Sequence, residues 1–89
     1  MEYAARFQLL VDRSVEKQLR SLPKRDTERI LSAIAELAVN PYSGDVAKMQ
    51  GEEDVWRRRV GSYRIFYEVL TKEKTVQVFR IERRTSKTY

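Results

Sequence analysis

The run from Val55 to Leu70 constrains the fold of this chain more than any other stretch, because its composition predicts two β-strands joined by a tight turn. Both halves are rich in valine, isoleucine and aromatic residues, which suit a pleated, half-buried surface. Gly61-Ser62 separates them, and glycine supplies the positive φ that a type II′ turn needs at its first central position. Counting outward from this turn places Arg59 opposite Arg64.

Side chains alternate between the two faces of a sheet, so the hairpin has two different faces. One face is apolar and aromatic, and it consists of Trp56, Val60, Tyr63, Ile65, Tyr67 and Val69. The other face carries Arg57, Arg59 and Arg64. Like charges directly opposite each other are destabilising. The pairing of Arg59 with Arg64 therefore indicates a site where an anion binds.

Composition excludes several classes of protein. A chain of 89 residues suits one domain, spanning residues 1–89. It has no cysteine, which rules out disulfides and fits a reducing cytoplasm. It also has no histidine, so neither a zinc site nor any other cofactor is expected. No apolar run approaches the length of a membrane span, and residues 1–10 lack a signal-peptide pattern.

The positive charge is concentrated in the second part of the chain. Residues 1–54 contain eight Lys/Arg and ten Asp/Glu, whereas residues 55–89 contain ten Lys/Arg and three Asp/Glu. Basic residues gathered on strands are typical of a protein that binds a polyanion, such as RNA, DNA or an acidic protein segment. The alternative is a basic face that is simply solvated.

The remaining elements follow from periodicity and from helix-breaking residues. We expect a strand over Tyr3–Val11, a helix to about Ser21, a helix from Pro23 to about Val39, a briefly extended Lys48-Met49 and a last strand over Thr75–Glu82. The apolar stripe of the second helix is predicted to comprise Ile30, Leu31, Ile34, Leu37 and Ala38. The order β-α-α-β-β-β predicts an α+β domain, in which a helix hairpin covers the Trp56 face of an antiparallel four-stranded sheet.

Several segments together carry a family resemblance. They are Leu22-Pro23-Lys24, Asn40-Pro41, Lys48-Met49-Gln50-Gly51, the run from Val55 to Glu68, Arg80-Ile81-Glu82-Arg83-Arg84 and Tyr89. In these segments the chain resembles the RelE toxins of the RelE/ParE superfamily, which belong to bacterial and archaeal toxin–antitoxin systems. The resemblance covers nearly the whole chain.

This resemblance implies a ribosome-dependent endoribonuclease that inhibits translation by cutting mRNA in the ribosomal A site. The reaction is metal-free: the 2′-hydroxyl attacks the adjacent phosphate, which requires cations for the developing charge, a base and an acid. By the same resemblance, the catalytic residues are Arg64, Arg84 and Tyr89, and the RNA-binding residues are Arg57, Arg59, Arg83, Lys87 and Lys48. The implied partners are an acidic RelB-like antitoxin, the ribosome and mRNA, in the cytoplasm.

The chain departs from the RelE pattern in ways that concern the acid and the base. Arg57 and Arg59 stand where the best-characterised members have lysines, and an arginine is a poor proton acceptor. Glu82-Arg83 replaces a glycine followed by histidine or lysine. Arg58 stands on the core-facing side, where it must snorkel, pair with an acid or mark a twisted strand.

Two alternatives to the ribonuclease stay open. One is a ParE-like toxin that has the same fold, binds DNA gyrase and cuts no RNA. The other is a catalytically decayed RelE-like module that still binds an antitoxin. The arginine cluster argues against the first, and the departures at Arg57, Arg59 and Glu82 keep the second open.

Overall fold

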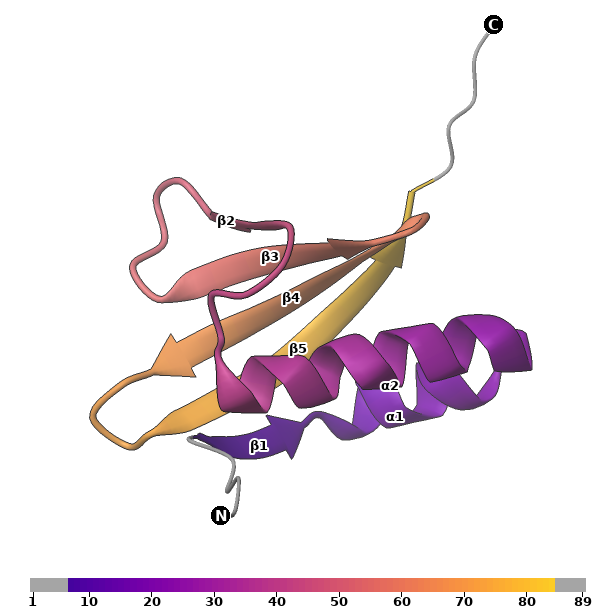
Figure 1. The fold of residues 1–89 in the computed structure, drawn as a ribbon, viewed down its shortest axis with the longest axis horizontal. Coiled ribbons are helices and arrows are strands. Elements are labelled where there is room, and N and C mark those ends of the chain that lie inside the picture. Colours follow the sequence, from indigo (N-terminus) through magenta and orange to yellow (C-terminus); the bar gives the residue numbers. More distant parts are fainter. Residues whose placement is uncertain (1–6, 85–89) are drawn as a thin grey trace, which may run out of the picture.

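The computed structural model describes residues 7–84, which form one sheet and two helices (Figure 1). The strands are β1 (Gln8–Val11), β2 (Val46–Lys48), β3 (Val55–Val60), β4 (Tyr63–Leu70) and β5 (Thr75–Arg83), and the helices are α1 (Arg13–Arg20) and α2 (Lys24–Val39). Pro23 immediately precedes α2, where its missing N–H costs nothing. Asn40-Pro41 ends that helix.

The predicted α+β class is confirmed, with both helices packed on one face of the sheet (Figure 1). The prediction of four antiparallel strands was wrong in two respects. The sheet has five strands in the order β1-β5-β4-β3-β2, and β1 runs parallel to β5. Parallel neighbouring strands need a long connection, and here the chain between β1 and β5 forms both helices and the β3–β4 hairpin. The additional strand is the three-residue β2, which pairs with β3 at the sheet edge.

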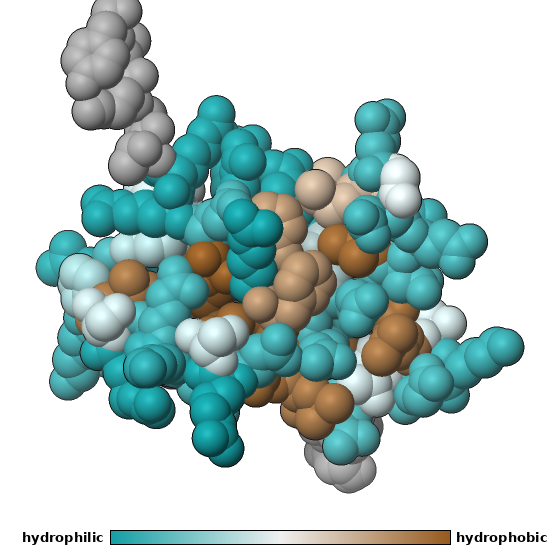
Figure 2. Space-filling model, turned by 180° about the vertical axis from the view of Figure 1, so that it is seen from behind, coloured by the Kyte–Doolittle hydropathy of each residue, from teal (hydrophilic) through white to brown (hydrophobic). Residues whose placement is uncertain are grey.

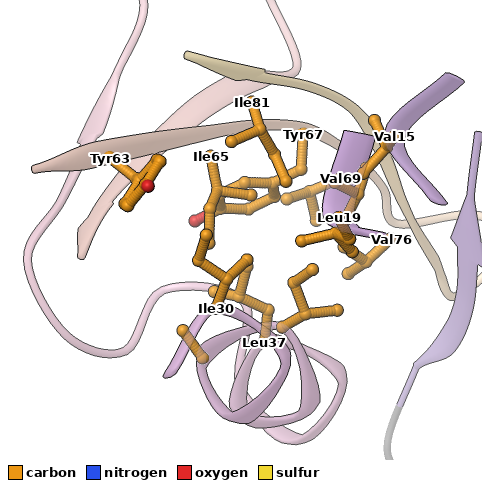
Figure 3. Close-up of a cluster of buried hydrophobic side chains, with 13 residues drawn as sticks. Val15, Leu19, Ile30, Leu37, Tyr63, Ile65, Tyr67, Val69, Val76 and Ile81 are labelled. Atoms are coloured by element: carbon orange, nitrogen blue, oxygen red, sulfur yellow. The ribbon is translucent and has the colours of Figure 1, made fainter. Parts of the chain in front are cut away.

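The central hairpin forms in the predicted register. Arg59 pairs with Arg64 and Trp56 with Tyr67. Gly61 has a φ of +57°, as the type II′ turn requires. The apolar side of β4 and β5 is buried beneath the helices (Figure 3).

The helices contribute to the core through Val15 and Leu19 of α1 and through α2, where Ile30 and Leu37 are joined by Ile34 (Figure 3). Leu31 was wrongly placed in the buried stripe, since it is 48% exposed. A helix turns about 100° per residue, so the residue after Ile30 points well away from the face that Ile30 buries. Ala33 takes part in the core instead.

Trp56 differs from its expected environment. Ile65 and Tyr67 are buried as predicted, whereas Trp56 is only half-buried. Its strand lies near the edge of the sheet, where the ring of Tyr42, from the loop after α2, contacts it with centroids 4.9 Å apart. A loop aromatic therefore covers part of the surface that we assigned to the helices.

Arg58 pairs with an acid, one of the three options that its position left open. Its Nη2 donates to Glu36 Oε1 of α2 at 2.8 Å, and its Nη1 donates to the carbonyl of Ser43 at 3.4 Å. Gly44 has a φ of +81°, and a Cβ there would lie 2.5 Å from Arg58 Cζ, so any larger residue must displace the guanidinium. This arginine therefore joins β3, α2 and the loop before β2.

A β-bulge lies in the pairing of β4 with β5. Phe66 pairs with Arg80 and Tyr67 with Val78, which leaves Phe79 as the extra residue. The bulge lets Val78 and Ile81, three residues apart, both point into the core. It also turns Phe79 and Arg80 together toward the helix-free side, where both line one hollow.

Candidate functional site

The face of the sheet opposite the helices carries two neighbouring cross-strand rows. One row consists of Arg59, Arg64 and Glu82, and the other consists of Arg57, Phe66 and Arg80. This side faces the viewer in Figure 2, where hydrophilic side chains surround a smaller apolar area. We call Arg57, Arg59 and Arg64 the arginine face.

Arg64 is the central cation of the arginine face. It is half-buried, and its Nε has no hydrogen-bond partner within residues 7–84. Neither Arg64 nor Arg57 forms an ion pair with any carboxylate in that range. A buried N–H without an acceptor is unfavourable, so Arg64 is suited to bind an anion that comes from outside the chain.

Two carboxylates moderate the charge around the arginine face. Asp45 Oδ2 lies 3.8 Å from Arg59 Nε, and because both side chains are well exposed, this pair is weak. Glu82 lies opposite Arg64 in the sheet and pairs with Arg80. Arg64 therefore keeps its charge available while its neighbours are partly neutralised.

The structure separates two other predicted RNA-binding residues, Lys48 and Arg83, from this face. Lys48 lies opposite Trp56, and Arg83 lies opposite Tyr63, so both belong to the helix-side register. The Arg83 guanidinium lies 5.9 Å from the centre of the Tyr63 ring. Neither residue is grouped with the arginine face.

Arg84 lies next to the hairpin turn, where its backbone N–H donates to the carbonyl of Ser62 at 2.6 Å. This bond brings the end of β5 close to the turn between Arg59 and Arg64. The two remaining predicted residues, Lys87 and Tyr89, lie outside the described part of the chain.

Sequence reasoning missed Arg80, which the bulge brings into the row of Arg57 and Phe66. A signal for it existed. The apolar residues Val76, Val78 and Ile81 break the period of two, and such a break predicts an extra residue in the strand.

The two buried tyrosines are part of the core rather than of the site. The Tyr63 hydroxyl donates to Asp26 Oδ2 at 2.8 Å, and this bond together with burial raises the pKa of Tyr63. The Tyr67 hydroxyl donates to the carbonyl of Pro41 at 2.6 Å, and burial raises its pKa strongly. Both hydroxyls stay protonated at neutral pH on the face away from Arg64.

The described residues contain no group of three or more His, Cys, Asp or Glu side chains that could hold a metal ion. Neither α1 nor α2 is long and apolar enough to cross a membrane.

Comparison with protein families gives a match over residues 7–87 to the model of the ParE toxin of the type II toxin–antitoxin system parDE. The RelE1 protein of Methanocaldococcus jannaschii is 28% identical over 82 residues, which cover 89% of this chain and 91% of that protein.

Two solved structures have the same fold. The archaeal RelE–RelB complex from Pyrococcus horikoshii contains a chain that is 31% identical, with a TM-score of 0.79 and coverage of 89% of this chain and 96% of that one. The isolated Escherichia coli RelE toxin superposes with a TM-score of 0.79 at 20% identity, over 91% of this chain and 87% of that one. At that lower identity the second likeness concerns the fold alone.

Proposed function

Because the chain belongs to the ParE toxin family of type II toxin–antitoxin systems, within the RelE/ParE superfamily, we propose that it acts as a ribosome-dependent mRNA endoribonuclease. The observation that carries this proposal is the arginine face. A half-buried Arg64 that has no carboxylate partner among residues 7–84, with Arg57 and Arg59 beside it, suits a phosphate in an RNA strand.

In the proposed reaction, the 2′-oxygen of a nucleotide attacks the adjacent phosphorus, and the bond from phosphorus to the 5′-oxygen breaks. The products are a 2′,3′-cyclic phosphate and a 5′-hydroxyl, whose oxygen takes its proton from water. Negative charge grows on the phosphate oxygens, where Arg64 and Arg84 stabilise it. Arg57 and Arg59 hold the RNA backbone as permanent cations and take no proton. Tyr89, with Lys87 as the second candidate, accepts the 2′-proton, and this assignment comes from the resemblance to RelE alone.

The proposed partner is a RelB-like antitoxin with an acidic segment, as the RelE chain of Pyrococcus horikoshii was solved together with RelB. Carboxylates on that segment would occupy the arginine face and exclude the phosphate. Association should then be fast and sensitive to salt. An on-rate that stays constant between low and physiological ionic strength would mean that the antitoxin recognises another surface. The cytoplasm, which holds the ribosomes and the antitoxin, is the proposed location.

The test is to map cleavage in mRNA that is being translated by purified ribosomes. Arg64→Ala should lower the cleavage rate about 100-fold or more, the usual effect of removing one transition-state donor. Arg13→Ala is a matched control, because Arg13 is an exposed arginine at the start of α1, on the helix side. Equal rates for the two variants would exclude Arg64 from the chemistry.

The family model's own name favours a second candidate, a ParE-like toxin that acts on DNA gyrase. Such a toxin would inhibit supercoiling by gyrase and leave translated mRNA intact. A supercoiling assay run beside the cleavage assay separates the two functions. A chain that is inactive in both assays but binds its antitoxin would be the decayed module.

A further inference from the structure

A hollow of about 430 Å³ opens on the helix-free face, beside the arginine face. Two phenylalanine rings, Phe66 and Phe79, form part of its lining, and Glu52, Glu68 and Arg80 supply polar groups. Its volume lies within the range of about 300–1,000 Å³ that is usual for small-molecule sites. The proposed reaction leaves it unused.

The aromatic part of the hollow suits a flat ring. Phe66 is only 9% exposed, and the Arg80 guanidinium lies 5.6 Å from the centre of its ring, so the exposed Arg80 side chain presents the accessible planar surface. The bulge at Phe79 adds a second ring to the same lining. Aromatic and guanidinium planes are the groups on which proteins stack unpaired RNA bases.

The carboxylates of Glu52 and Glu68 determine which nucleobase the hollow can bind. Neither Glu52 nor Glu68 forms an ion pair or a side-chain hydrogen bond within the described residues. Carboxylates repel the phosphates of RNA, but they accept hydrogen bonds from exocyclic amino groups. Cytosine, adenine and guanine each carry such a group, whereas the exocyclic groups of uracil are carbonyl oxygens and its one donor on that edge is the ring N3–H between them.

The hollow is also at a suitable distance from the proposed cleavage site. Phe66 and Arg57 belong to the row next to that of Arg59 and Arg64. Adjacent same-face residues lie two positions apart on a strand, which corresponds to about 6.6 Å. A phosphate bound at Arg64 would therefore leave the base of a neighbouring nucleotide within reach of the hollow.

We propose that this hollow binds one unpaired, amine-bearing nucleobase of the RNA strand whose phosphate lies on the arginine face. Arg80 and Phe79 stack on the base, and Glu68 accepts from its amino group. The inference rests on the proposed function for its place beside the cleaved bond, and it makes the hollow the element that sets codon preference.

The first test uses the isolated protein and needs no ribosome. CMP carries an amino group where UMP carries a carbonyl oxygen. Each nucleotide is titrated separately into the protein while the NMR chemical shifts of the protein are followed. CMP should shift the signals of Phe66 and Phe79 and bind about tenfold or more tightly than UMP, the scale of one good base-edge contact. Equal affinities, or shifts elsewhere on the protein, would overturn the proposal.

The second test compares cleavage at codons that differ only by cytosine or uracil at one position. Wild-type protein should prefer cytosine by about tenfold at one codon position. Glu68→Gln should reduce that ratio toward one, because an amide can also donate to the uracil carbonyl. Glu73→Gln, at an exposed site in the β4–β5 turn, should leave the ratio unchanged.

The outcomes separate the two proposals. Cleavage without any cytosine preference overturns the base site and leaves the ribonuclease standing. If no RNA is cleaved, the ribonuclease proposal fails, and the CMP and UMP titration alone decides whether the hollow binds a base.

Discussion

The two faces of the sheet are built from the same strands, but one forms the hydrophobic core and the other is open to solvent. On the covered face, Ile65 and Tyr67 have no exposed surface, and the only charged side chain that reaches in from the hairpin, Arg58, is paired with Glu36. On the open face, Arg64 is half-buried and lacks a partner among the described residues. One face maximises burial, and the other keeps a cation that forms no ion pair within residues 7–84 and that an external anion can bind.

Arg58 and Arg64 show this difference most directly. The Nε of each is buried without a hydrogen bond within residues 7–84. Arg58, however, has a carboxylate at 2.8 Å and a backbone carbonyl in range, whereas Arg64 lies between Arg59 and a glutamate, Glu82, that pairs with Arg80 instead. The comparison teaches that burial of an arginine alone does not mark a site, and that the missing partner does.

The largest expected difference is between alanine substitutions at two adjacent positions that point to opposite faces of the sheet. Ile65→Ala should lower the free energy of unfolding by about 2–5 kcal/mol, because it leaves a cavity in the core. Arg64→Ala, one residue earlier, should leave it unchanged or slightly raised, because repulsion from Arg59 is relieved. Urea unfolding of both variants measures the difference. A loss above about 1 kcal/mol for Arg64→Ala would show that the open face also holds the fold together.

The hairpin register and the division between the faces could be predicted from the sequence, because both follow from the alternation around Gly61-Ser62 and from local turn chemistry. The fifth strand could not, since β2 has three residues and gains its hydrogen bonds only from β3. The parallel pairing of β1 with β5 joins segments that are distant in sequence, and no local pattern encodes it.

Part of the candidate site was equally predictable. Arg57, Arg59 and Arg64 share one face because of strand parity alone. Lys48 pairs with Trp56, so strand parity places it on the other face. That pairing could not be foreseen because β2 itself was not predicted as a strand of the sheet. The hollow was beyond prediction because it needs the bulge at Phe79 and a wall from the loop before β3.

The next effect concerns the rim of the covered face. Trp56→Ala should cost about 2 kcal/mol, less than the 3–5 kcal/mol of a fully buried aromatic, because the ring is only half-buried. Tyr42→Ala should lower the free energy of unfolding by part of the same amount, because the two rings pack together. A double-mutant cycle by urea unfolding measures their coupling. Additive losses would mean that Tyr42 does not stabilise Trp56.

A smaller effect tests how Arg58 is held. Gly44 and Gly51 both have a φ of +81°, but a Cβ meets the Arg58 guanidinium only at Gly44 and has no atom within 4 Å at Gly51. Gly51→Ala should cost about 1 kcal/mol for the left-handed backbone. Gly44→Ala should cost about 2 kcal/mol, because the guanidinium must also leave Glu36. Equal losses in thermal unfolding would show that the Arg58 contact contributes nothing to stability.

The smallest effect concerns the covered face at alkaline pH. The pKa of Tyr67 is raised in the folded protein, so the folded state retains a proton that the unfolded chain loses near pH 10. Stability is therefore fully present below about pH 10 and falls as the pH rises above it. Tyr67→Phe should cost about 1 kcal/mol at pH 7 by leaving the Pro41 carbonyl without its donor.

The same substitution should also flatten the alkaline decline in stability, and Tyr63 accounts for what remains, because its pKa is raised as well. Tyr63→Phe is the comparison, because the Tyr63 hydroxyl donates to the Asp26 carboxylate rather than to a backbone carbonyl. Urea unfolding at pH 7, 9, 10 and 11 would follow all three proteins. An unchanged slope above pH 10 in Tyr67→Phe would mean that the hydroxyl of Tyr67 ionises as freely in the folded protein as in water. The covered face would then be open to solvent at its centre, and its contrast with the arginine face would be lost.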